Sequence, residues 1–336
     1  MGILRAGHRS AGEIAAHSRS ALDRPLAHPG ELWIALARDE GLLLGAFQRA
    51  AGAPSIAPRS RRGSGGPEVR VGPDTLHVAL ALASPGALTP CDERRIVNRA
   101  VRPLLRALTR VGALAHFFGR DWISVRHRPA GWVGFAHDAT TRRTLFEAFI
   151  ALRTPFHLGP RASFLGKTPG TLEEIVGQAI QPERLVGAIV DAYVAAWAVE
   201  PVDTSPREPP SAEREQANDL GSGARKAAAA APFGEGEHAN DLAPDRGDPP
   251  WAATVEEAIG TLGAGPDALG VFRIGGDLLV SRDALARLEA RSPHVPDDAL
   301  GALVDETLGA PGVALDGVRS LTSVRDVIAQ GRARTP

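Results

Sequence analysis

Apolar residues in the first two hundred positions recur with both strand and helix spacing. The runs Leu32–Arg38 and Leu42–Phe47 are short and apolar, and an Asp-Glu-Gly segment joins them, which predicts a β-hairpin. In Thr75–Ala83, large apolar residues alternate with mainly small ones, so both faces of the predicted strand are apolar. This pattern is typical of a strand that is buried on both sides of a sheet.

Two amphipathic helices are predicted further along the chain. Thr89 can cap the first, Pro90 suits its first turn, and apolar residues recur at helical spacing until Gly112, which can end it. Pro103 lies inside this pattern and predicts a kink or a displaced start. The second helix is predicted over Pro182–Val199, where one stripe of the helix is apolar.

Three strands and a short helix are predicted between these two helices. The strands are Asp121–His127, Gly131–His137 and Thr144–Leu152. Thr171 and Glu174 have the spacing of a capping box, which predicts the start of the short helix. Residues 1–200 are therefore predicted to form one domain of mixed strands and helices.

The composition changes after residue 200. Residues 201–250 are rich in Pro, Gly, Ala and charged residues and poor in large apolar ones, which predicts a disordered linker. Residues 251–330 become apolar again and predict a small α+β module. In that module we expect a helix over Thr254–Gly263, a hairpin over Leu269–Ser281 that turns at Gly275-Gly276-Asp277, and then three helices.

Composition and charge narrow the possible functions. Lys and Arg total 38 and Asp and Glu total 39, so the net charge is -1, which disfavours a general nucleic-acid binder but leaves room for local basic patches. With Cys91 as the single cysteine, no intramolecular disulfide can form, and the scattered histidines have no metal-binding spacing, so we predict no metal site. No apolar run has the length of a signal peptide or a membrane span. We therefore predict a cytoplasmic protein with neither a membrane nor a nucleic-acid partner.

The segment Pro58–Val71 places two arginines before a glycine-rich turn. Glycine lets backbone N–H groups converge on an anion without obstruction by Cβ, and arginine adds charged, forked donors. Because no dinucleotide or Walker spacing is present, the segment alone favours the alternative of a mobile basic turn. The candidate ligand residues are Arg61, Arg62, Gly63, Ser64, Gly65 and Gly66.

A second stretch, Phe117–Asp138, also carries arginines at turns. Arg120 precedes one predicted strand, and Arg128 lies in the turn before the next. Both can reach the face that carries the glycine-rich turn, although alone they would be two arginines of an ordinary hairpin.

In order and spacing, these motifs resemble lipoate-protein ligase A and the biotin/lipoate ligase family over residues 20–199. Gly45 and Gln48 stand at a Gly-Arg-Asn-Gln-like turn, and Arg61–Gly66 matches the Arg-Arg-x-Ser-Gly-Gly part of the family loop. Gly119–Asp121 matches a Gly-Arg-Asn-Asp turn, and Arg128–Gly131 stands at a Lys-Ile-Ser-Gly turn. The resemblance implies an α+β fold with a mixed β-sheet packed by helices.

The resemblance also implies an activity. Lipoate or a related acyl acid such as octanoate would be activated with ATP, alone or with Mg²⁺, and transferred to a carrier lysine. The carrier would be a lipoyl domain of a dehydrogenase complex or a glycine cleavage protein. The implied catalytic residues are Arg128, which stands at the family lysine position, and Arg120. The implied substrate contacts are Gly45, Arg61, Arg62, Ser64, Gly65 and Gly66.

Two departures from the family pattern leave other functions open. Arg128 replaces the lysine, and its guanidinium differs from an ammonium in shape and donors. Pro67 replaces the third glycine of the loop and removes an N–H. The alternatives are a catalytically degenerate relative that binds an acyl ligand or a carrier protein, and a protein–protein adaptor that uses the C-terminal module.

Overall fold

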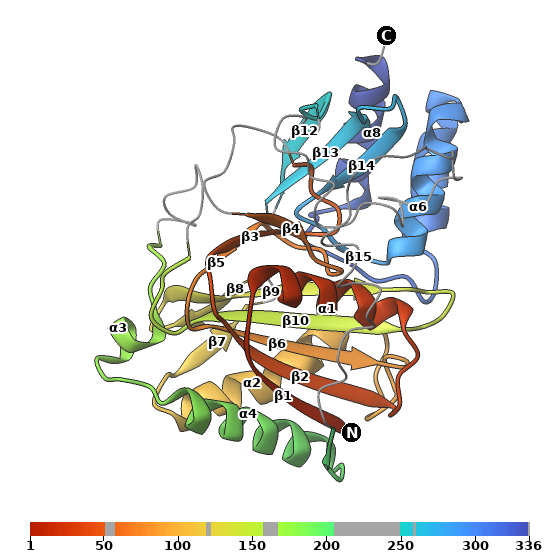
Figure 1. Ribbon diagram of the computed structural model, residues 1–336. Coiled ribbons are helices and arrows are strands. Elements are labelled where there is room, and N and C mark those ends of the chain that lie inside the picture. The colour runs from red at the N-terminus through yellow and green to blue at the C-terminus, as the bar shows by residue number, and fades with distance from the viewer. Residues whose placement is uncertain (51–57, 119–121, 157–166, 205–248, 258–259, 335–336) are drawn as a thin grey trace, which may run out of the picture.

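A mixed β-sheet of eight strands forms the centre of the protein (Figure 1). The computed structural model describes residues 1–50, 58–118, 122–156, 167–204, 249–257 and 260–334. The strand order is β11-β1-β2-β6-β10-β9-β8-β7, and β1 is parallel to both β2 and β11, whereas the other pairs are antiparallel. The strands are β1 (Gly2–Arg9), β2 (Gly30–Ala37), β6 (Thr75–Leu82), β7 (Ala115–Phe117), β8 (Trp122–Val125), β9 (Arg128–His137), β10 (Thr144–Ala151) and β11 (Val202–Asp203).

Helices cover both faces of this sheet, as predicted for the α+β class. Helices α2 (Ile96–Arg110) and α4 (Pro182–Trp197) pack on one face, and α1 (Ala11–Asp23) lies on the other. The alternation of β6 divides the two cores, because Leu76, Val78 and Leu80 face α2 and α4, whereas Ala79 and Ala81 face α1. Every residue of β6 is buried, which confirms the strand predicted to be apolar on both faces.

The predicted hairpin over residues 32–47 is wrong, although both of its strands exist. β2 pairs with β1 and β6, whereas β3 (Gly41–Leu44) leaves the large sheet. β3 instead joins β4 (Arg59–Arg61) and β5 (Val69–Val71) in a second, three-stranded sheet. The backbone N–H and C=O groups of both strands are hydrogen-bonded to strands distant in sequence, and an apolar pattern does not specify which strands pair.

The long helix begins later than its capping signals predicted. α2 starts at Ile96, and the Asp92 carboxylate accepts a hydrogen bond from Arg95 N at 3.0 Å just before it. Pro103 still lies inside the helix, so the later start does not place this proline in the first turn. The predicted end is confirmed, because Gly112 has a φ of 92° and Ala113 N donates to Leu108 O. Thr171 caps α3 (Leu172–Val176) as predicted.

The C-terminal module contains the three predicted helices, α6 (Arg282–Arg291), α7 (Leu300–Leu308) and α8 (Leu321–Ala333). Two short 3-10 helices, Ser292–His294 and Asp297–Ala299, separate α6 from α7. Most of the predicted linker, residues 205–248, lies outside the described residues.

The helix predicted over residues 254–263 is wrong, and so is the hairpin over 269–281. Strands β12 (Ala253–Glu256), β13 (Thr261–Pro266) and β14 (Phe272–Gly276) form a sheet there. β15 (Leu279–Val280) does not pair with β14, but with β16 (Leu315–Asp316). Within β13, position 263 requires glycine, because a Cβ there would lie 2.3 Å from the Trp251 ring that packs on the backbone.

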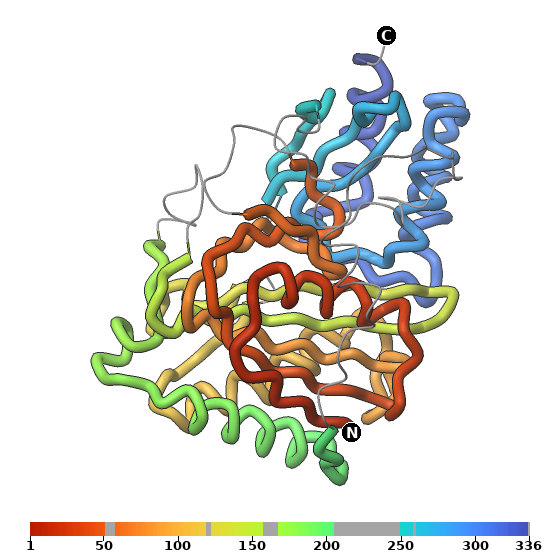
Figure 2. The backbone as a smooth tube through the Cα atoms, in the orientation of Figure 1, coloured from red at the N-terminus to blue at the C-terminus, as the bar shows by residue number. Residues whose placement is uncertain are grey.

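The module packs on the large sheet and takes a residue from the N-terminal part of the chain. Phe47, only 1% exposed, lies in the core of the module with residues of β13, β14 and the three helices. The backbone trace shows the segment after β3 rising into the module (Figure 2). Within the described part of the chain, no helix is long and apolar enough to cross a membrane.

Candidate functional site

The arginine- and glycine-rich turn lies between the large sheet and the C-terminal module. It connects β4 to β5, and the N–H groups of its three glycines are directed into protein. Gly65 N donates to Phe135 O of β9 at 2.8 Å, and Gly66 N donates to Leu278 O of the module at 2.7 Å. Gly63 N donates to the Ser18 hydroxyl at 2.8 Å. The N–H groups predicted to converge on an anion are therefore occupied by protein acceptors in this conformation.

Arg62 is the centre of the turn and is 1% exposed. Its Nε donates to Ser64 Oγ at 3.0 Å, and Nη1 donates to Leu43 O at 2.9 Å. Its Nη2 donates to Gly65 O at 3.1 Å and Pro67 O at 2.7 Å. A fixed fork of charged donors thus holds the turn in one shape.

Arg61 and Gly45 complete the turn on the side of the module. Arg61 Nη1 donates to the carbonyls of Gly45 and Gln48. A Cβ at Gly45 would lie 2.1 Å from Gly66 O, so only glycine permits this approach of two backbones. The structure therefore brings six predicted residues together: Gly45, Arg61, Arg62, Ser64, Gly65 and Gly66.

A buried carboxylate lies beneath the turn. Glu147 of β10 and His77 of β6 are both fully buried, and His77 Nε2 and Glu147 Oε1 are 2.7 Å apart. Ser18 of α1 donates to Glu147 Oε2 at 2.7 Å, and the same hydroxyl accepts from Gly63 N. Burial alone raises the pKa of the Glu147 carboxyl, but the hydrogen bond and charge of His77, with help from Ser64 and Arg62, lower it to about 2. The turn is thus connected to an ionised carboxylate in the core.

Aromatic rings surround this carboxylate. His77 lies between Trp33 and Phe149, with ring centroids 5.1 and 4.6 Å away. His17 stacks on Trp33 at 4.1 Å, and burial lowers the pKa of His17 to about 3, so this ring is neutral at pH 7. Sequence reasoning missed these polar residues, although Glu147 and His77 each interrupt an otherwise apolar strand.

Arg128 is not part of this cluster. It begins β9, whereas Gly66 approaches Val133 O, five residues further along the strand and about 16 Å away. The Arg128 guanidinium donates to Glu174 Oε1 at 2.8 Å and to the carbonyls of Thr168 and Pro169. Its role in catalysis stays a prediction, and Arg120 lies outside the described residues.

Two polar seams hold the C-terminal module against the N-terminal part of the chain. At the first, Gln48 Nε2 donates to Asp277 Oδ1 at 2.6 Å, and the Arg49 guanidinium lies 3.7 Å from the Trp251 ring centroid. At the second, Arg282 pairs with Asp23 at 3.0 Å and Asp138 at 3.3 Å.

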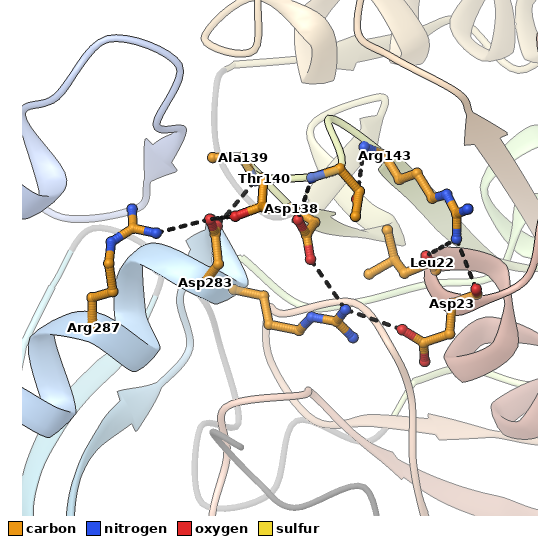
Figure 3. Close-up of polar contacts among 10 residues, drawn as sticks. Leu22, Asp23, Asp138, Ala139, Thr140, Arg143, Asp283 and Arg287 are labelled. Carbon is orange, nitrogen blue, oxygen red and sulfur yellow. Dashed lines mark hydrogen bonds and ion pairs between the residues drawn. The ribbon is translucent and has the colours of Figure 1, made fainter. Parts of the chain in front are cut away.

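Residues at the start of α6 strengthen the second seam (Figure 3). Asp283 accepts hydrogen bonds from Ala139 N and from the Thr140 hydroxyl, both at 3.0 Å. Among the described residues, no group of three or more His, Cys, Asp and Glu side chains can hold a metal ion.

Comparison with known proteins gives a result only at the level of structure. No family model matches the sequence, and no curated protein does. P. falciparum LipL1, in complex with lipoate, matches over 98% of this chain and 100% of its own, with a TM-score of 0.62 and 12% identity. The bipartite lipoate protein ligase of Thermoplasma acidophilum matches over 62% of this chain and 87% of its own, with a TM-score of 0.50 and 12% identity.

This chain has the lipoate ligase fold. Lipoate-protein ligase A bound with ATP matches as well, over 61% of this chain and 89% of its own, with a TM-score of 0.50 and 12% identity. The LipL1 match also covers the C-terminal module, so both the large sheet and the module have counterparts in one lipoate ligase fold.

Proposed function

We propose that the protein is a lipoate-ligase-like enzyme that activates lipoate or a related acyl acid with ATP and transfers it to a carrier lysine. The observation that carries this proposal is the position of the Arg62–Gly66 turn, at the seam of a fold that matches LipL1 along nearly its whole length. Such a turn provides backbone donors and a guanidinium where a carboxylate or phosphate would need charge stabilisation. The carrier we propose is a lipoyl domain.

The turn requires one rearrangement before it can bind an anion. Leu278 O accepts the hydrogen bond from Gly66 N, so this donor becomes available only when the segment between β14 and β15 moves away. Arg62 stays committed to the turn itself, because four hydrogen bonds already use its Nε, Nη1 and Nη2 atoms. Gly66 N–H is therefore the group that we propose contacts the acid or the nucleotide phosphate, and Arg61, whose Nη1 donates to the Gly45 and Gln48 carbonyls, adds its positive charge nearby.

A second candidate function is binding of an acyl ligand or carrier without catalysis. The side chain at the family lysine position favours it, because Arg128 is already engaged by Glu174 and two carbonyls far from the turn. The two candidates make different predictions for one assay.

The assay combines purified protein with ATP, labelled octanoate or lipoate, and a purified lipoyl domain. Mass spectrometry of the nucleotide and of the carrier detects the acyl-adenylate and the acylated lysine. Absence of both products would refute the ligase function. Stabilisation of the protein by the acid alone in a thermal shift would then support the binding function.

A matched pair of arginine variants tests Arg128. Arg128→Ala removes the guanidinium that pairs with Glu174, and Arg153→Ala removes the one that pairs with Glu173 on the same short helix. If Arg128 stabilises charge during the reaction, only Arg128→Ala lowers kcat. Equal activity of the two variants would remove Arg128 from the mechanism.

A further inference from the structure

Helix α2 carries a row of arginines on its exposed face. Arg99, Arg102, Arg106 and Arg110 are all exposed and follow one another at spacings of three and four residues, so they share one side of the helix. At a rise of 1.5 Å per residue, the row is about 16 Å long. We call these four residues the α2 arginine face.

The α2 arginine face has no charge partner within the described part of the chain. None of its four guanidiniums makes an ion pair or a hydrogen bond there, whereas neighbouring Arg95 pairs with Asp92. The acidic residues of the adjacent helix α4, Glu183 and Asp191, are exposed and do not pair with it either. Like charges at such spacings destabilise a helix by about 0.2–0.5 kcal/mol per pair. The four positive charges are therefore not neutralised within the described part of the chain and can meet an external anionic partner.

At the C-terminal end of α2, the α2 arginine face borders apolar side chains. An open hollow of about 490 Å³ is lined by Arg102, Arg106 and Arg110 together with Leu105, Thr109 and Ala115. In the segment of chain around β7 that follows the helix, Leu114 is 55% exposed and Phe118 is 61% exposed. Arginine and aromatic residues are enriched at protein–protein interfaces.

This surface lies on the opposite side of the sheet from the Arg62–Gly66 turn. The buried side of α2 packs on the Leu76 and Val78 side chains of β6, and the turn contacts the other face through Glu147 and Ser18. A sheet and a helix layer separate the two by about 20 Å. A partner bound to α2 would leave the turn accessible, so it is distinct from a carrier that presents its lysine to the turn.

We propose that the α2 arginine face binds an acidic protein surface, with carboxylates meeting the arginines and an apolar side chain entering the hollow. Arginine suits carboxylates because its planar fork makes two parallel hydrogen bonds. A membrane is disfavoured because the apolar side of α2 is buried against the sheet and α4 and cannot insert into lipid. A nucleic acid fits less well, because the net charge of -1 provides no wide positive surface beyond the four arginines to follow a phosphate backbone.

The test is fluorescence anisotropy with a fluorescein-labelled helical peptide that carries glutamates and leucines on one face. We expect the wild-type protein to bind it, and affinity to fall as NaCl rises from about 0.05 to 0.2 M. The variant Arg102→Ala/Arg106→Ala/Arg110→Ala should lose about tenfold or more in affinity, because three charge contacts are removed. Phe118→Ala should also weaken binding but keep the salt dependence, because it removes apolar contact alone.

A control variant keeps the same change in net charge. Arg5→Ala/Arg38→Ala/Arg325→Ala removes three exposed arginines outside α2 and should bind the peptide like the wild-type protein. Circular dichroism should show both triple variants folded, since alanine replaces exposed arginines at little cost.

Three results would overturn the proposal. They are no binding by the wild-type protein, equal binding by the α2 variant, and an equal loss in the control variant. Tighter binding of a single-stranded oligonucleotide or of phosphatidylserine vesicles than of the peptide would overturn it as well. None of these outcomes depends on ligase activity.

Discussion

Glu147 connects the core to the Arg62–Gly66 turn, and its replacement by glutamine tests that connection. Glutamine keeps the shape of the side chain but removes its charge, so His77 and Arg62 lose the ion that they face. A fall in the carboxyl pKa from 4.5 to about 2 corresponds to about 3 kcal/mol of stability in the ionised form. Removing a buried charge from its hydrogen-bonded partner has a comparable cost of about 3–5 kcal/mol. We therefore expect Glu147→Gln to lower the free energy of unfolding by about 3 kcal/mol.

Urea denaturation followed by tryptophan fluorescence measures this loss, because Trp33 lies against the cluster. In thermal unfolding, a loss of this size lowers Tm by about 4 °C for a chain of this length. Glu183→Gln on the exposed side of α4 is the matched control and should stay within about 0.5 kcal/mol of wild type. The double variant Glu147→Leu/His77→Phe should recover about half of the loss or more, because apolar pairs often replace buried ion pairs well.

The pH dependence supplies a further check. Because the pKa of Glu147 is lowered in the folded state, its contribution is full above its ordinary pKa of 4.5 and is lost as the pH falls towards about 2. The difference between wild type and Glu147→Gln should therefore shrink in that window. A Glu147→Gln protein within about 0.5 kcal/mol of wild type at pH 7 would refute the role of this carboxylate.

Three further predictions concern the turn and the seam. In urea denaturation, Gly45→Ala should destabilise the protein by about 2 kcal/mol, because its Cβ would meet Gly66 O. The control Gly187→Ala, in open space on α4, should stabilise the protein by about 0.5 kcal/mol, and equal effects of the two variants would contradict the close approach. Arg282→Ala should speed hydrogen exchange in β15 and in the Arg62–Gly66 turn, because it removes the ion pairs with Asp23 and Asp138. The control Arg325→Ala, whose partner is the exposed Asp326, should leave this exchange unchanged, and unchanged exchange in Arg282→Ala would mean that the second seam does not hold the module. Despite burial, hydrogen bonds lower the pKa values of Asp138 and Asp283, so their contribution to stability is full above the ordinary pKa of 3.8 and is lost as the pH falls below it. The radius of gyration in X-ray scattering should therefore stay constant down to pH 3.8 and rise below it, less so in Asp138→Asn, and a constant radius below pH 3.8 would contradict this.

Local periodicity was enough to predict the elements that pack on one core. β6, β10, α4 and the three C-terminal helices follow directly from their apolar spacing, because each buries a stripe or face that its own sequence defines. The pairing of the strands could not be predicted in this way. β3 and β15 pair with strands that periodicity cannot select, since the choice depends on contacts made far along the chain.

In the candidate site, too, the local features could be predicted from the sequence and the long-range ones could not. The Arg62–Gly66 turn was visible because its residues are consecutive, and it does lie where two parts of the structure meet. Glu147 and His77 are 70 residues apart, and each looks like an isolated polar residue in an apolar strand. Ser18 belongs to α1, a helix that was not predicted although Ser10 and Glu13 form a capping box at its start.

Phe47 has a consequence for how the chain folds and how it can be divided. Because this ring fills the core of the C-terminal module with Leu262 and Ile274, a fragment of residues 249–336 would present an apolar hole to water. Such a fragment should be poorly soluble alone and should be rescued by the N-terminal fragment added in trans. During synthesis the order is favourable, since Phe47 leaves the ribosome before the module that closes around it.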